Sequence, residues 1–248
     1  DYSFIRKAIE DGTLSIERVN EAVTRILATK LAQKVMDAEG NLLKKAPETI
    51  NLKREEHEAC ADEIAKKAVT LVKDRDKLLP VTPEKYPRIR LYVLGDSDDG
   101  GFKEGGHVTQ EFKKRLEAEG FSVSLFDRGN LDFHEVFEEG VCDMKDKFDL
   151  ALYVANVETA SNQTTTRLDW IHLMAADAPW FMKSIPTVFI STANPYHLFD
   201  IPNVSTYINA YTGNRATIDA VMRKLTGREP FEGISPVDPF CGHFETRL

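Results

Sequence analysis

Residues 148–170 read FDLALYVANVETASNQTTTRLDW, and this stretch decides the expected fold. Its first eight residues are apolar apart from Asp149, which predicts a strand buried on both faces, as at the centre of a parallel sheet. From Asn156 to Arg167 the stretch becomes polar. Because open α/β sheets bind ligands at the carboxyl ends of their strands, we predict that this polar loop borders a binding site.

Strand and helix patterns alternate on both sides of this stretch. We expect strands at residues 69–72, 89–94, 121–126, 150–155, 187–191 and 206–209. We expect helices at residues 109–119, 133–139, 168–176 and 216–226. Strands separated by helix-length segments form right-handed βαβ units. The predicted fold is therefore an α/β sandwich, with a mostly parallel sheet of five or six strands and helices on both faces.

An N-terminal helical segment precedes this region. Residues 1–36 have the pattern of two helices, and Ser15 is placed to cap the second. Residues 37–52 contain glycine and proline and lack periodicity, so we interpret them as a linker to an α/β domain at 53–248. The chain begins with Asp1 inside a helical pattern, and we interpret it as a piece of a longer protein.

Composition argues against several classes of protein. Hydrophobic residues make up 42% and charged residues 29%, as in a globular chain. A net charge of −8 argues against a nucleic-acid partner, which requires clustered Lys and Arg. No apolar run reaches the length of a membrane span. The three cysteines, Cys60, Cys142 and Cys241, are expected to be free and buried.

The usual motifs of metal, serine and phosphate chemistry are missing from the sequence. The six histidines lack metal-ligand spacing, and there is no G-x-S-x-G element. Residues 95–101, GDSDDGG, follow a predicted strand but match no phosphate-binding or calcium-binding motif. We interpret them as a flexible connecting loop, with a loop at the edge of a ligand site as the alternative.

The polar loop has the composition of a sugar site. Asn156, Glu158, Asn162, Gln163 and Arg167 offer hydrogen-bond donors and acceptors within twelve residues. Each sugar hydroxyl donates and accepts, so this mixture suits a carbohydrate. The alternative is a polar surface loop that bonds to itself and to water.

Two further candidates follow the strand predicted at 187–191. Asn194 and Tyr196 lie at the same edge of the sheet as the polar loop. Pro195 disfavours helical geometry at the preceding residue, so we expect Asn194 in an extended turn.

Four segments resemble, in order, motifs of glycoside hydrolase family 3. Residues 15–30, SIERVNEAVTRILATK, resemble the helix that closes that family's catalytic barrel. Residues 65–80, AKKAVTLVKDRDKLLP, resemble the element that opens its second domain, although Thr and Asp replace the usual Ser and Asn. Residues 185–198, IPTVFISTANPYHL, resemble a strand ending in N-P-Y-x-L, and residues 231–237, FEGISPV, resemble a terminal F-x-G-x-x-P-V element.

This resemblance covers nearly the whole chain and is greatest to the β-N-acetylglucosaminidase branch. It implies an intact enzyme that removes β-linked N-acetylglucosamine with retention, without metal or organic cofactor. The nucleophile and an Asp–His acid/base belong to the barrel, of which residues 1–36 would be the helical tail. The missing barrel would be the partner of this chain, which alone is expected to be inactive. The residues expected at the sugar cleft or domain interface are Asn156, Asn162, Gln163, Arg167, Asn194 and Tyr196.

Two alternatives stay open. The β-glucosidase and β-xylosidase branch draws its general acid from the second domain, where Glu158 is the only carboxylate between Ala155 and Arg167. We favour the first branch, because a carboxylate so close to a strand end is poorly placed to reach another domain. The other alternative is a non-catalytic carbohydrate-binding or docking module on the same scaffold. A cytoplasmic location is favoured over export.

Overall fold

The computed structural model describes residues 1–41, 54–96, 107–158 and 167–243. The chain is divided into two compact units, which are Asp1–Arg54 and Glu55–Leu248. The first unit contains helices α1 (Tyr2–Glu10) and α2 (Ile16–Ala32). The Ser15 side chain caps α2, as predicted, by accepting a hydrogen bond from Arg18 N at 3.2 Å. Neither helix buries a residue, and large apolar side chains of both are exposed.

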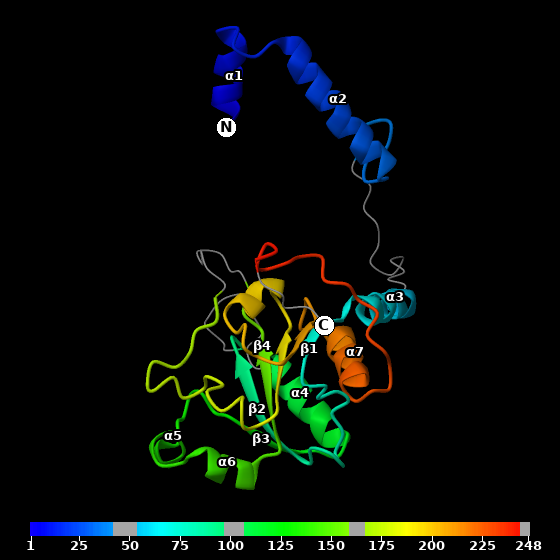
Figure 1. The fold of residues 1–248 in the computed structure, drawn as a ribbon. Helices are drawn as coiled ribbons and strands as arrows, with labels where there is room; N and C mark the ends of the chain where they lie inside the picture. The colour runs from blue at the N-terminus through cyan, green and yellow to red at the C-terminus, as the bar shows by residue number, and fades with distance from the viewer. Residues whose placement is uncertain (42–53, 97–106, 159–166, 244–248) are drawn as a thin grey trace. The chain divides into compact units, whose positions relative to one another are not determined.

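A six-stranded sheet forms the centre of the second unit (Figure 1). The strands run in the order β1-β6-β5-β4-β2-β3, and only β1 is antiparallel to its neighbour. Their bounds are Thr70–Asp74 (β1), Arg88–Leu94 (β2), Ser122–Leu125 (β3), Leu150–Ala155 (β4), Thr187–Ser191 (β5) and Thr206–Asn209 (β6). The predicted fold class is confirmed, and β4, β5 and β6 have the predicted bounds.

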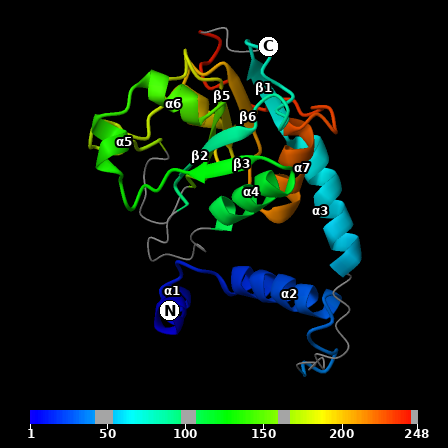
Figure 2. The same cartoon turned by 90° about the horizontal axis from the view of Figure 1, so that it is seen from below.

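The two faces of the sheet have different covers. Helices α3 (Arg54–Ala68), α4 (His107–Ala118) and α7 (Arg215–Leu225) contribute to the core on one face. Helix α6 (Val141–Lys147), the short 3₁₀ helix η2 (Pro195–Phe199) and turns around residues 171–185 contribute to the other. Helix α5 (Phe133–Phe137) lies with α6 on this second side, as Figure 2 shows. None of the helices in the described ranges is long and apolar enough to cross a membrane.

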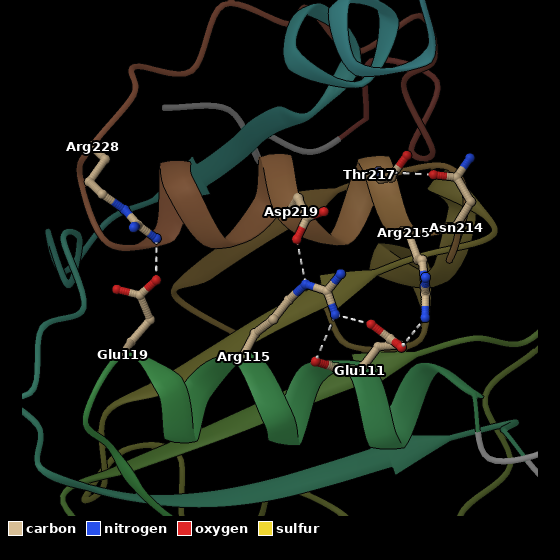
Figure 3. A network of polar contacts seen from close by, with 8 residues as sticks. All are labelled: Glu111, Arg115, Glu119, Asn214, Arg215, Thr217, Asp219 and Arg228. Carbon is tan, nitrogen blue, oxygen red and sulfur yellow. Dashed lines mark hydrogen bonds and ion pairs between the residues drawn. The ribbon is translucent and has the colours of Figure 1, made fainter. Parts of the chain in front are cut away.

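Helices α4 and α7 are joined on the first face by an ionic network (Figure 3). The Arg115 guanidinium bonds to Asp219 on α7 and to Glu111 on its own helix. Glu111 is also 3.5 Å from the guanidinium of Arg215. The hydrogen bond from Arg115 lowers the pKa of Glu111, and the hydrogen bond to Asp219 raises the pKa of Arg115. Outside this pair, Arg228 bonds to Glu119 at the end of α4.

Aromatic rings stack in a row across the second face. Register partners Tyr92 and Tyr153 have ring centroids 4.4 Å apart, and the row continues through Phe189 to Tyr207. Phe126, just beyond β3, stacks on Tyr92 at 5.0 Å. Such cross-strand pairs stabilise a sheet on the face they share. Burial raises the pKa of Tyr92 to about 12 and holds the pKa of Tyr153 well above its ordinary value.

The C-terminal segment passes from one face of the sheet to the other. Phe231 packs against the first core cluster, whereas Phe240 belongs to the second and stacks on Phe199 at 5.6 Å. Between them, Gly233 approaches the start of β1 so closely that an added Cβ would lie 2.4 Å from Thr70 Oγ1. Residues 231–240 therefore run past the first strand of the sheet.

Two predictions about this unit were wrong. Residues 168–176 form no helix: 168–171 are irregular and turns begin at 172. The backbone is left-handed at Met174 (φ 56°) and Ala175 (φ 49°), a conformation that a right-handed helix excludes. The three cysteines are free, as predicted, but exposed rather than buried. Helix α6 was not predicted, and residues 97–101 of the glycine-rich loop lie outside the described residues.

Candidate functional site

The strand order places a topological switch point between β2 and β4. From β2 the chain crosses to β3 on one side, and it then returns to β4 on the other side of β2. Doubly wound sheets bind ligands at this position, at the carboxyl ends of the strands. Asp96 follows β2 here and Asn156 follows β4. The fold thus identifies this edge of the sheet as the candidate site.

A chain of hydrogen bonds spans the switch point. Asp96 Oδ2 accepts from both the backbone N–H and the hydroxyl of Thr109, at 2.7 and 2.6 Å. The amide nitrogen of Asn156 lies 3.4 Å from Asp96 Oδ1, and its amide oxygen accepts from the Thr192 hydroxyl at 3.0 Å. The contacts connect the first turn of α4 with the ends of β2, β4 and β5. The amide of Asn156 is therefore engaged within the protein.

Two glycines allow the backbone to pack closely around this chain of contacts. At Gly95, where φ is +74°, an added Cβ would lie 2.6 Å from Val157 Cγ2. At Gly213, after β6, it would lie 2.7 Å from Val108 Cγ2 and 3.1 Å from Asn156 Oδ1. Real Cβ atoms do not approach other atoms so closely, so the positions of these segments depend on glycine.

A pocket of about 230 Å³ opens beside Asp96. Its wall includes the hydroxyl-bearing Thr109, the carboxylates Asp96 and Asp127, and Arg128. Arg128 donates to the Asp169 carbonyl at 2.7 Å and lies 2.8 Å from the Asp177 carboxylate. Carboxylates, hydroxyl and guanidinium together provide acceptors and donors suited to a small ligand rich in hydroxyl groups.

Three other predicted site residues have their contacts at η2 rather than at Asn156: Arg167, Asn194 and Tyr196. The Arg167 guanidinium pairs with Asp200 at the C-terminal end of η2 and lies 4.8 Å from the centroid of the Phe199 ring. Asn194 caps the other end, since its Oδ1 accepts from Tyr196 N at 2.8 Å. Asn194 is extended (φ −114°, ψ 121°), as its position before proline predicted. Tyr196 is exposed.

The other predicted site residues have less structural definition. Glu158 is exposed and lies three residues beyond the end of β4. Asn162 and Gln163 lie outside the described residues. The roles of all these side chains at a sugar cleft or domain interface stay predictions. In the described part of the chain, no group of three or more His, Cys, Asp or Glu side chains is arranged to hold a metal ion.

Sequence analysis missed Thr192 and Gly213 as members of the site, and it included Asp96 only through the alternative interpretation of residues 95–101 as a loop at the edge of a ligand site. Asp96 and Thr192 each follow a predicted strand closely, which was the available signal. The strand order that brings Asp96 to Asn156 depends on contacts between residues sixty positions apart, which no local pattern reveals. Gly213 is recognised only from its distance to Val108 and Asn156.

Comparison with known proteins finds relatives whose names are those of glycosidases and a glycoside phosphorylase. No family model matches the sequence. A β-N-acetylglucosaminidase/β-glucosidase from Cellulomonas fimi is 40% identical over 250 residues, which cover 100% of this chain and 43% of that protein. The structure of the β-glucoside phosphorylase BglX is 38% identical, with a TM-score of 0.79, over 100% of this chain and 43% of that one.

A third match carries the family name. A glycoside hydrolase family 3 β-N-acetylglucosaminidase from Paenibacillus sp. str. FPU-7 has the same fold, with a TM-score of 0.59 at 21% identity over 94% of this chain and 41% of that one. The resemblance to the C-terminal portion of glycoside hydrolase family 3, which the four motifs implied, is confirmed by these matches. It spans less than half the length of these relatives.

Proposed function

We propose that the chain is the second domain of a retaining glycosidase and forms a wall of the sugar cleft without supplying a catalytic group. In this proposal residues 1–36 are the tail of a catalytic barrel, residues 37–52 are the linker and residues 53–248 are the α/β domain. The exposed apolar side chains of α1 and α2 support it, because an amphipathic helix requires a surface to bury that face.

The observation that carries this proposal is the hydrogen-bond chain through Asn156. Retaining hydrolysis uses two carboxyl groups about 5 Å apart, one as nucleophile and one as acid/base. The polar stretch after β4 has a single carboxylate, Glu158. The side-chain amide of Asn156, the first residue of that stretch, is hydrogen-bonded to Asp96 and Thr192. In this proposal the loop contacts the sugar, while the paired carboxyl groups belong to the barrel.

The proposed substrate is a glycan with a terminal β-linked N-acetylglucosamine. The Cellulomonas fimi relative is named for that activity and for a β-glucosidase activity. The β-glucosidase or β-xylosidase alternative, in which Glu158 is the general acid, differs in one residue role and can be tested on the same protein.

A second candidate is phosphorolysis, which the two structures of β-glucoside phosphorylase BglX favour at 38% and 39% identity. In a retaining mechanism the glycosyl group is first bonded to the enzyme carboxylate. An oxygen of inorganic phosphate would then form a bond to C1 as the carboxylate leaves, giving a sugar 1-phosphate. Water in the same position gives the free sugar.

The test uses this chain joined to its barrel. We expect turnover of 4-nitrophenyl N-acetyl-β-glucosaminide at a higher kcat/KM than of the β-glucoside. Product analysis with and without phosphate separates the two reactions, because only phosphorolysis yields a sugar 1-phosphate. A higher kcat/KM for the β-glucoside would contradict the proposed substrate.

The 248-residue chain alone is expected to give no turnover of either nitrophenyl glycoside. Turnover by the chain alone, proportional to its concentration and retained through purification, would overturn the assignment of the catalytic groups to a barrel. Sugar binding without turnover in the joined protein would favour a carbohydrate-binding module.

A further inference from the structure

A second pocket, of about 300 Å³, lies on the sheet face opposite α4 and α7. Its walls come from β2, from the residue that follows β3, from helices α5 and α6 and the link between them, and from the turns at residues 174–181. The wall includes Tyr92, Phe126, Glu135, Glu139, Trp180 and Phe181. Phe126 is shared with the pocket beside Asp96, and none of the four hydrogen-bonding residues at the switch point lines this second pocket.

The pocket has an aromatic floor and an exposed aromatic rim. Tyr92, Phe126 and Phe181 are buried, and they belong to the row of rings on this face. Trp180 stands nearly perpendicular to Phe181, with an interplanar angle of 74° and a centroid distance of 5.6 Å. The Trp180 side chain is nevertheless 55% exposed. A large flat apolar surface therefore meets solvent at the mouth of the pocket.

The charges of the wall are balanced by residues of the protein itself. Glu135 pairs with the buried Arg90, and Glu139 pairs with Lys147. The Arg90 guanidinium also lies 5.2 Å from the centroid of the Phe126 ring, so a cation is already present between Glu135 and the aromatic floor. An additional organic cation would meet this positive charge, whereas a neutral ligand would not.

The carboxylates still favour a ligand with hydrogen-bond donors. An ionised carboxylate only accepts hydrogen bonds and has about four acceptor sites, so Glu135 retains acceptor capacity after its contact with Arg90. In Glu139, Oε2 is buried and has no hydrogen-bond partner among the described residues. The ligand that fits this wall is neutral, has an apolar face and carries hydroxyl or amide donors.

The rim is built from strained backbone. Met174, at the mouth, and Ala175 are consecutive non-glycine residues with left-handed φ values of 56° and 49°. Such conformations are sparsely populated by residues other than glycine and collect at ligand sites. Asp177, fully buried, holds the turn by accepting a hydrogen bond from Ile171 N at 2.8 Å.

We propose that this pocket is a second saccharide-binding site, separate from the switch point. The apolar face of one sugar ring would lie on the Trp180 indole, and hydroxyl or acetamido donors of the ring would face Glu135 and Glu139. The proposal concerns binding only, and it does not depend on which reaction the intact protein performs.

The test measures saccharide binding to the 248-residue chain. Trp170 and Trp180 are its only tryptophans, so the variant Trp170→Phe reports Trp180 fluorescence alone. Titration of this variant with cellobiose and with N,N′-diacetylchitobiose is expected to give a saturable change for at least one of them, with a Kd on the order of 1 mM. Calorimetry on the unsubstituted chain should give the same Kd.

Three variants locate the binding. Trp180→Ala is expected to weaken calorimetric binding at least tenfold, and Trp180→Tyr, which retains a ring, to weaken it less. Phe137→Ala is the matched control, because Phe137 is an exposed aromatic of α5 outside the pocket wall. Circular dichroism melts show whether each variant is folded.

Several results would overturn the proposal. They are the absence of saturable binding by either disaccharide, unchanged binding by a folded Trp180→Ala variant, and loss of binding on Thr109→Ala, which alters the other pocket. Binding of tetramethylammonium but of neither disaccharide would also contradict it. None of these measurements involves catalysis, so a failure here leaves the proposed glycosidase function to its own test.

Discussion

The amide oxygen of Asn156 accepts a hydrogen bond from the Thr192 hydroxyl at 3.0 Å, which joins the carboxyl ends of β4 and β5. The amide nitrogen of the same residue faces Asp96, which in turn holds the first turn of α4. The side-chain amide of Asn156 therefore links the carboxyl ends of β2, β4 and β5. Because both ends of the amide are engaged within the protein, few of its hydrogen-bonding positions are left for a sugar. The contribution of these contacts can be tested by measuring the stability of variants.

Removing the amide should destabilise the α/β unit. Asn156→Ala eliminates two hydrogen bonds, so we expect the free energy of unfolding to fall by about 1–3 kcal/mol. Urea unfolding of the 248-residue chain measures this change. Glu158→Gln, two residues further along the chain at an exposed position, is the control and should leave the free energy of unfolding unchanged within about 0.5 kcal/mol.

Replacing the same amide by a carboxylate should add a pH dependence. Asn156→Asp places a second negative charge near Asp96, so the shared site binds a proton more readily in the folded than in the unfolded state. A raised carboxyl pKa in the folded state makes the variant regain stability as pH falls. We expect the deficit relative to the unsubstituted chain to be larger at pH 7 than at pH 5. An equal deficit at both values would argue against close contact with Asp96.

The close approach at Gly213 predicts a steric cost. In Gly213→Ala the new methyl group would lie 2.7 Å from Val108 Cγ2, and Val108 is buried in α4. We expect a loss of about 1–3 kcal/mol in the free energy of unfolding. Gly140→Ala is the matched control, because its Cβ would come no closer than 3.6 Å to another side chain. Equal stability of the two variants would show that α4 shifts freely.

The network between α4 and α7 should contribute measurably to stability at neutral pH. Arg115→Met breaks charge-assisted bonds to Asp219 and Glu111, and we expect a cost of about 2 kcal/mol because these groups are only partly exposed. Lys113→Met removes a charge from the same helix, where Lys113 is 3.9 Å from Glu117. That control should cost no more than about 0.5 kcal/mol.

The stability of the Arg115→Met variant should be less sensitive to acid than that of the unsubstituted chain. Arg115 lowers the pKa of Glu111 in the folded state, so its contribution is complete above the unfolded pKa of 4.5 and is lost as pH falls through the folded value. The stability difference between the unsubstituted chain and Arg115→Met should therefore narrow from pH 5 toward pH 3. Arg215 also faces Glu111, so part of the shift persists in the variant. A difference that widens on acidification would contradict the assignment.

Glu158 decides between the two enzyme branches. In the joined protein, Glu158→Gln should reduce kcat by less than about tenfold if the acid belongs to the barrel, because a general acid is worth about 10²–10⁴-fold. A loss in that larger range, partly restored by azide, would assign the acid to Glu158. Measuring kcat and KM separately shows whether the side chain affects binding or chemistry.

Local sequence patterns predicted the features that depend mainly on residues close together in the sequence. The apolar run before Asn156 is a central strand with the predicted bounds, and Pro195 set the conformation of Asn194. The helix expected at 168–176 failed because the spacing of its apolar residues does not show that Asp177 is buried and holds the backbone of Ile171 in a turn. The site was only partly predicted, because the contact between Asp96 and Asn156 depends on the order of the strands in the sheet, which local sequence patterns do not show.

The passage of Gly233 beside β1 has a consequence for the chain in solution. A strand at the margin of a sheet carries backbone groups that attract strands of other molecules, and β1 has a sheet neighbour on one side only. Gly233 lies against the carbonyls of Ala68 and Val69, and it has no side chain to hold the two segments apart. Residues 231–240 thus obstruct sheet extension at this margin, and their removal would expose a template for aggregation.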